Sequence, residues 1–128
     1  MEIFFLLGRI FYGGYFVMMG INHFRNKKML AGYGESRGLS APGGAVMLSG
    51  LLLILSGMSI VLGVWIKAAV AFLVIFLFLV SLIMHAFWKD TDPMTKMSNQ
   101  INFMKNMALL GAALILPMIK EPWLWSAF

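Results

Sequence analysis

The sequence contains no cysteine among its 128 residues. A chain without thiols forms no disulfide, supplies no thiolate ligand to an iron–sulfur cluster and performs no thiolate catalysis. These three kinds of chemistry are therefore excluded within this chain.

Acidic residues are also scarce, with five Asp and Glu against ten Lys and Arg. All five lie near the ends of apolar runs or between them: Glu2, Glu35, Asp90, Asp92 and Glu121. Ion-coupled transporters usually bind their ion at a carboxylate inside the membrane, so this absence disfavours one. The net charge of +5 has no soluble basic domain to present it, and we expect no nucleic-acid partner.

Apolar residues dominate what remains, at 61% of the chain. Four runs of about 20 largely uncharged residues each match the length of helix that crosses a hydrocarbon core. They cover residues 3–21, 45–64, 66–87 and 101–119. Because backbone groups in lipid must be satisfied within the segment, we predict an all-α integral membrane protein built as a bundle of four transmembrane helices.

The connections between these spans differ in length and character. The first is long and mixes bases with Met29, Leu30 and Tyr33, which predicts a short helix over residues 27–33 lying on the membrane surface. The second, around residues 64–67, is short enough to require a tight antiparallel hairpin. In the third, we expect Ser98 or Asn99 to cap the fourth helix. The tail is expected to place Trp123 and Trp125 in the interfacial belt.

Basic residues predict the orientation of the bundle. The first and third connections carry six of the Lys and Arg residues, whereas the opposite side carries Lys67, Lys120 and at most Arg9. The positive-inside rule then places these connections in the cytoplasm and both termini outside, in what we expect to be a prokaryotic cytoplasmic membrane. The first span has no basic segment before it and no small-residue cleavage site, so we expect it to remain in the mature protein.

Several polar side chains fall at one membrane depth. His23 ends the first span and His85 ends the third, which runs in the same direction, while the fourth span starts from that same side. The predicted layer comprises Asn22, His23, His85, Trp88, Asn102, Lys105 and Asn106. Such a layer suits the polar head group of a quinone or lipid, with Trp88 and Phe103 flanking a ring and His85 and Lys105 donating to a carbonyl. The simpler alternative is that each residue only bridges helices or meets lipid head groups.

Arg9 lies about two turns inside the first span and has two interpretations. It either extends to the nearby membrane surface or faces inward, where it binds an anion or a quinone carbonyl. Two histidines could also serve as axial haem ligands or bind a metal. Because no third strong ligand has metal spacing and no four-histidine pattern exists, we predict no metal site and do not favour haem.

The sequence resembles the DoxX family of small four-helix membrane proteins. The resemblance rests on "GINHF", on "AGYGESRGLSAPGGAVMLSGLLLILSGMSIVLG", and on "HAFWKD" followed by "INFMKNMALLGAALIL". It implies one transmembrane domain over residues 1–128 without a soluble catalytic domain. The motif positions that carry over are His23, Phe24, His85, Trp88, Phe103, Lys105 and Asn106. Relatives include subunits linked to a terminal quinol oxidase, to thiosulfate:quinone oxidoreduction and to oxidative-stress complexes, although most members have no established activity.

Three hypotheses follow for the function. The leading one is a membrane-embedded subunit of a quinone-linked oxidoreductase system, either non-catalytic or quinone-binding, that holds a quinone or lipid-like ligand near the cytoplasmic face and contacts redox-complex partners. The second is a non-enzymatic assembly or interaction protein, which uses the same layer for helix packing or partner docking. The third is a small-solute or lipid transporter, which would need a homo-oligomer or a lipid-sized path.

Overall fold

The chain is described by a computed structural model over residues 1–127, and within them it forms helices and connecting turns without strands. The elements are α1 (Glu2–Arg25), α2 (Lys27–Ser36), α3 (Pro42–Leu62), α4 (Ile66–Ile83), the 3₁₀ turn η1 (Phe87–Lys89), α5 (Pro93–Ile115) and the 3₁₀ turn η2 (Leu116–Met118). Segments beginning with α1, α3, α4 and α5 are long and apolar enough to cross a membrane. This confirms the predicted four-helix architecture.

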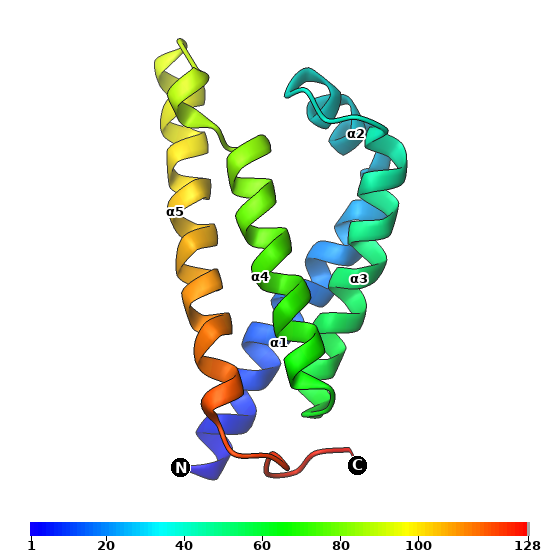
Figure 1. The fold of residues 1–128 in the computed structure, drawn as a ribbon, viewed down its shortest axis with the longest axis vertical. Helices are drawn as coiled ribbons and strands as arrows, with labels where there is room; N and C mark the ends of the chain where they lie inside the picture. The colour runs from blue at the N-terminus through cyan, green and yellow to red at the C-terminus, as the bar shows by residue number, and fades with distance from the viewer. Residues whose placement is uncertain (128) are drawn as a thin grey trace.

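The long helices form two antiparallel pairs, α1 with α3 and α4 with α5 (Figure 1). The pairs meet near the end that carries both termini and diverge toward the other end, where α2 lies (Figure 1). Residues 63–65 join α3 to α4, so the predicted tight hairpin is present. The helix predicted for the first connection is also present, as α2.

Glycines bring α1 and α3 into backbone contact. A Cβ atom built at Gly13 would lie 2.5 Å from the carbonyl oxygen of Gly57, and one at Gly20 would lie 2.5 Å from that of Gly50. The seven-residue spacing on both helices places these contacts along one antiparallel seam. In lipid, helices associate through close packing of this kind.

A shared core joins the two pairs. Phe16 of α1, Leu53 of α3, Leu73 of α4 and Ala113 of α5 are fully or almost fully buried against one another. The hydroxyl of Tyr12 also donates to the carbonyl oxygen of Leu109 at 2.6 Å. These contacts close the bundle at its middle and leave its other end to be closed by polar residues.

The fourth helix begins eight residues earlier than predicted, and neither Ser98 nor Asn99 caps it. Asp92 is the N-cap, and its carboxylate accepts hydrogen bonds from the backbone N–H of Thr95 at 3.0 Å and from the Thr95 hydroxyl at 2.9 Å. Pro93 follows as the first helical residue, where its missing N–H costs nothing. The Asp92–Pro93 pair is therefore a helix start, and it places Asn99 about two turns inside α5.

The third span also departs from prediction, because α4 ends at Ile83. His85 lies in the turn that follows and Trp88 lies in η1, so these residues do not share a helical stripe with Ser81. Side chains at the end of α2 bind two carbonyls of the turn that follows α4. The Tyr33 hydroxyl lies 2.9 Å from the oxygen of Met84, and the Arg37 guanidinium donates to that of Ala86 at 3.0 Å.

The tail folds back against the end of the bundle that carries the termini. Trp123, expected in the interfacial belt, is only 2% exposed and packs in the core with its ring centroid 5.2 Å from that of Phe5. The backbone N–H of Ala127 donates to the carbonyl oxygen of Leu62, which fastens the tail to α3. Trp125 remains exposed.

Candidate functional site

One cavity of about 250 Å³ opens between α1 and α2 on one side and α4 and α5 on the other. Five residues of the predicted layer line it: His23, His85, Asn102, Lys105 and Asn106. The remaining lining is largely apolar and includes Tyr15, Phe16, Tyr33 and Phe76. Counting the spans predicted that these polar groups lie on one side of the bundle, and the helix packing brings them to one cavity.

His23 is held by its own helix. Its Nδ1 atom lies 2.8 Å from the carbonyl oxygen of Met19, one turn earlier in α1. Its ring centroid lies 6.1 Å from that of Phe76 on α4. This contact fixes the imidazole in the last turn of α1 and directs it between the two helix pairs.

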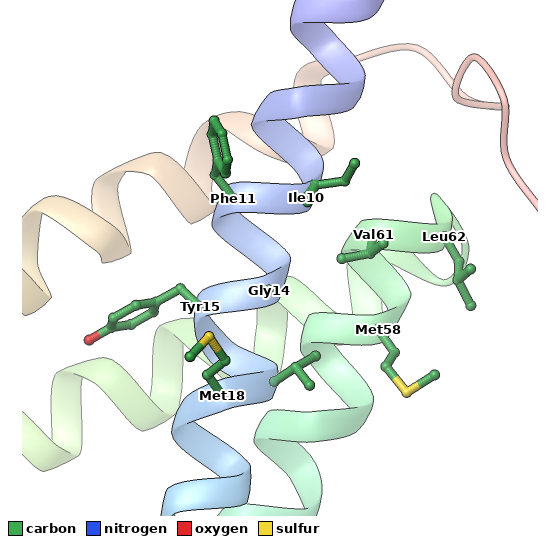
Figure 2. Close-up of a pocket in the computed structure, with 9 residues that line it drawn as sticks. Ile10, Phe11, Gly14, Tyr15, Met18, Met58, Val61 and Leu62 are labelled. Carbon is green, nitrogen blue, oxygen red and sulfur yellow. The ribbon is translucent and has the colours of Figure 1, made fainter.

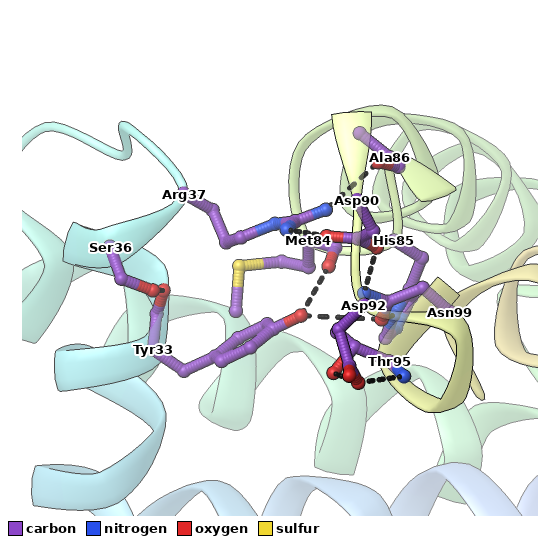
Figure 3. A network of polar contacts seen from close by, with 10 residues as sticks. All are labelled: Tyr33, Ser36, Arg37, Met84, His85, Ala86, Asp90, Asp92, Thr95 and Asn99. Carbon is purple, nitrogen blue, oxygen red and sulfur yellow. Dashed lines mark hydrogen bonds and ion pairs between the residues drawn. The ribbon is translucent and has the colours of Figure 1, made fainter. Parts of the chain in front are cut away.

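His85 is held by a chain of polar groups that crosses three elements (Figure 3). Its Nδ1 lies 3.1 Å from Oδ1 of Asn99, whose Nδ2 donates to the carboxylate of Asp90 at 2.7 Å. The Asp90 carboxylate in turn forms an ion pair with Arg37, the C-cap residue of α2, at 2.8 Å. The hydroxyl of Tyr33 also lies 3.2 Å from Asn99 Oδ1. This network fastens α2 to the α4–α5 connection and orients His85.

The Asp90 carboxylate belongs to the charged end of this network. Hydrogen bonds from Asn99 and then from Arg37 hold the pKa of the Asp90 carboxyl below its ordinary value of 3.8. Both members of the ion pair are largely shielded within the chain. Asp90 is therefore ionised at neutral pH and keeps the Asn99 amide oriented with its nitrogen toward the carboxylate.

We expect this carboxylate to make the fold sensitive to acid. A carboxyl whose pKa is lower in the folded than in the unfolded chain stabilises the fold above its unfolded pKa, and that contribution is lost as the pH falls through the lower, folded value. Asp90→Asn should therefore lessen the fall in Tm between about pH 5 and pH 3, measured by thermal unfolding in detergent. Glu35→Gln, which removes an exposed carboxylate on α2, is the control. If Tm falls as much between about pH 5 and pH 3 in Asp90→Asn as in the wild type, the assignment is contradicted.

Asn106 and Lys105 supply donors from α5. Asn106 is 6% exposed, lines the cavity, and makes no side-chain hydrogen bond with any of residues 1–127. Lys105 is more exposed, with Nζ 3.5 Å from Oδ1 of Asn102 and 5.8 Å from the ring centroid of Tyr15. No carboxylate lines the cavity, so its polar edge is neutral to positive.

Trp88 and Phe103, which were predicted to flank a bound ring, do not line the cavity. They form an aromatic cluster with Phe87, in which ring centroids lie 5.3–5.9 Å apart, and Trp88 is 50% exposed. Aromatic residues such as Tyr15 and Phe76 line the cavity wall instead. Counting back in fours from His23 gives Met19 and Tyr15, and this spacing could have identified Tyr15 from the sequence.

Arg9 lies apart from the other predicted residues, and it does not extend to the surface. Its side chain is buried, with the residue 3% exposed, near the end that carries the termini. The guanidinium donates to four backbone carbonyl oxygens, those of Ile60, Val61, Leu124 and Trp125. The rings of Phe5 and Trp123 lie 5.5 and 5.7 Å from its central carbon. Its donors are occupied by the end of α3 and by the tail, so we assign it a structural role.

Two further hollows are mainly apolar. A second cavity of about 250 Å³ shares His23, Val46, Phe76, Val80 and Met84 with the first and is otherwise almost entirely apolar. A wider groove of about 670 Å³ lies on the outer face of α1 and α3, lined by residues such as Phe11, Met18 and Met58 (Figure 2). The second cavity adjoins the first through these shared residues, whereas the outer groove has the lining expected of a surface that faces acyl chains.

Within residues 1–127, no group of three His, Asp or Glu side chains is arranged to hold a metal ion. The polar side chains that line the cavity, two histidines, two asparagines, one lysine and two tyrosines, instead suit hydrogen bonding to an organic head group.

Comparison with known proteins identifies the family. No curated protein and no solved structure matches this chain. The DoxX family model matches residues 4–86, which is more than half of the chain and includes both histidines of the cavity. The four apolar helices agree with the membrane location of that family. The chain is therefore an integral membrane protein of the DoxX family.

Proposed function

We propose that the protein is a membrane subunit of a quinone-linked oxidoreductase system and that its cavity binds the head group of a lipid-soluble quinone. The observation that carries this proposal is the convergence of His23, His85, Asn102, Lys105 and Asn106 on one cavity with otherwise largely apolar walls. A binding site for an amphiphile needs this combination of a few polar groups and an apolar surround.

Volume and charge support a head group as the occupant. The 250 Å³ cavity is smaller than the roughly 300–1,000 Å³ of sites that enclose whole drug-sized ligands. It therefore suits one ring and its substituents, with a tail leaving along the adjoining apolar cavity. The Lys105 amine and the Asn106 amide supply donors for ring oxygens, and the absence of a lining carboxylate avoids repulsion of those oxygens.

The chain itself offers binding and orientation rather than electron transfer. It has no cysteine, and within residues 1–127 no group of three His, Asp or Glu side chains could hold a metal ion. In the proposed role, electrons reach the quinone from a partner, and this subunit holds the ring between aromatic walls such as Tyr15 and Phe76. Trp88, exposed beside Phe87 and Phe103, lies outside the cavity and is available to a partner.

Asn106→Leu tests the proposed site. The substitution removes the unpartnered amide at similar volume, and we expect it to weaken binding of a decyl-tailed benzoquinone about tenfold, the value of one hydrogen bond of ordinary strength. Equilibrium binding to protein in lipid nanodiscs, corrected for partition into empty nanodiscs, measures this effect. Lys120→Met is the control because Lys120 is exposed and lies outside the cavity. Non-saturable binding by the wild type, or equal affinity in Asn106→Leu, would contradict the proposal.

The polar network favours a second candidate, a non-enzymatic assembly protein. Arg37, Asp90, Asn99 and His85 form a continuous structural connection, which serves folding whether or not a ligand binds. This candidate predicts that Asn99→Leu, which breaks this connection, alters thermal stability or the recovery of co-purified partners and leaves quinone affinity unchanged. Thermal unfolding and mass spectrometry of co-purified proteins, performed on the same variant, distinguish the two.

A further inference from the structure

The two histidines of the cavity are fixed in the same tautomer. Each ring directs Nδ1 at an oxygen that can only accept, the carbonyl of Met19 for His23 and the amide Oδ1 of Asn99 for His85. In the neutral ring, Nδ1 must then carry the proton, and Nε2 is left as an acceptor. Within residues 1–127, Nε2 of neither ring makes a hydrogen bond.

For His85, this assignment depends on residues outside the cavity. The Asn99 amide could present either its oxygen or its nitrogen to the imidazole. The Asp90 carboxylate, 2.7 Å from Asn99 Nδ2, accepts only and therefore settles the orientation. Arg37 holds that carboxylate at 2.8 Å. Arg37, Asp90 and Asn99 are thus positioning residues that act on the cavity through His85.

A cavity with two imidazole acceptors and no lining carboxylate matches a ligand that donates. A quinone ring offers carbonyl oxygens, which accept only, whereas its reduced form carries two hydroxyls that donate. We propose that the cavity selects the hydroxylated, hydroquinone form of the head group, with His23 and His85 accepting its hydroxyls and the Arg37–Asp90–Asn99 chain enforcing the tautomer of His85. Lys105 and Asn106 then donate to the lone pairs of the same hydroxyl oxygens. This inference rests on the proposed function and specifies which redox form the site prefers.

The tautomers can be observed directly because the chain has only two histidines. In protein labelled with ¹⁵N-histidine at a pH where both rings are neutral, we expect protonated Nδ1 and unprotonated Nε2 signals for both residues. In Asn99→Leu, His85 should lose this preference and populate the Nε2–H tautomer that free imidazole favours in water. His23 is the internal control, since its partner is a backbone carbonyl of its own helix. An unchanged His23 signal also reports that the variant has folded.

Binding completes the test with a matched pair of ligands, 2-decyl-1,4-hydroquinone and 2-decyl-1,4-benzoquinone, measured anaerobically in nanodiscs. We expect the wild type to bind the hydroquinone about tenfold more tightly, and Asn99→Leu to lose most of that preference. A protonated Nε2 on either wild-type histidine, or quinone binding as tight as hydroquinone binding, overturns the inference and leaves the proposed function standing. Saturable binding of neither compound overturns both.

Discussion

Replacing Arg9 with methionine is expected to lower the free energy of unfolding by about 3–5 kcal/mol, although the residue is far from the cavity. Exchanging a complete buried ion pair for apolar groups is often tolerated, but here only the donor would be removed. The carbonyls of Ile60, Val61, Leu124 and Trp125 would remain. A buried carbonyl left without a donor costs about 1–3 kcal/mol, and the methionine also loses the cation–π contacts with Phe5 and Trp123. The Ile60 carbonyl keeps its hydrogen bond from the Gly63 N–H, so the loss falls mainly on the other three.

Thermal unfolding in detergent measures this effect. For a chain of this length we expect Arg9→Met to lower Tm by about 10 °C or more. Lys67→Met, which removes an exposed charge at the start of α4, is the control and should change Tm little. If Arg9→Met unfolds within about 2 °C of the wild type, the guanidinium does not fasten the tail to α3.

Adding one methyl group at Gly57 is the second large effect that we expect. The new Cβ would collide with the backbone oxygen of Gly13 and approach the Val17 backbone nitrogen to 2.8 Å, so the seam between α1 and α3 must open. Overpacking of this kind costs about 1–3 kcal/mol, and a backbone atom cannot rotate away as a side chain can. Gly57→Ala should therefore lower Tm despite the better helix propensity of alanine.

Gly14→Ala provides the matched comparison. It makes the same chemical change one residue from the seam, where a Cβ meets no atom within 4 Å. It should leave stability unchanged or raise it by up to about 1 kcal/mol through helix propensity. The two alanine variants are compared by thermal unfolding in the same detergent. A stabilising Gly57→Ala would show that α1 and α3 do not meet at this glycine.

The sequence predicted the depth of the site residues but not their rotation about the helix axes. Counting spans places His23, His85 and the start of the fourth helix on one side, and no tertiary information is needed for that step. Which face of α5 meets the cavity depends on packing. Asn102 and Asn106 face it, whereas Phe103, turned about 100° from Asn102, packs on Trp88 instead.

Other differences arose where a distant segment supplies a partner. Nothing local to Arg9 reveals that residues 124 and 125 return to accept its hydrogen bonds. Nothing local to His85 reveals that Tyr33 and Arg37 bind carbonyls of the turn in which it lies. Asn99 was missed as part of the site because it was expected to cap a helix. Its spacing with Asn102 and Asn106, three and seven residues on, is the signal of one polar helix face.

The proposed function depends most on whether a quinone ring enters the cavity between the two helix pairs. Photocrosslinking with an azidobenzoquinone carrying a decyl tail, followed by peptide mass spectrometry, locates the ring directly. We predict adducts on cavity residues that do not line the outer groove, such as Met19 and Met84, suppressed by excess unlabelled decylbenzoquinone and reduced in Asn106→Leu. Adducts confined to the outer groove, on residues such as Phe11, Met18 and Met58, and insensitive to competitor, would contradict it.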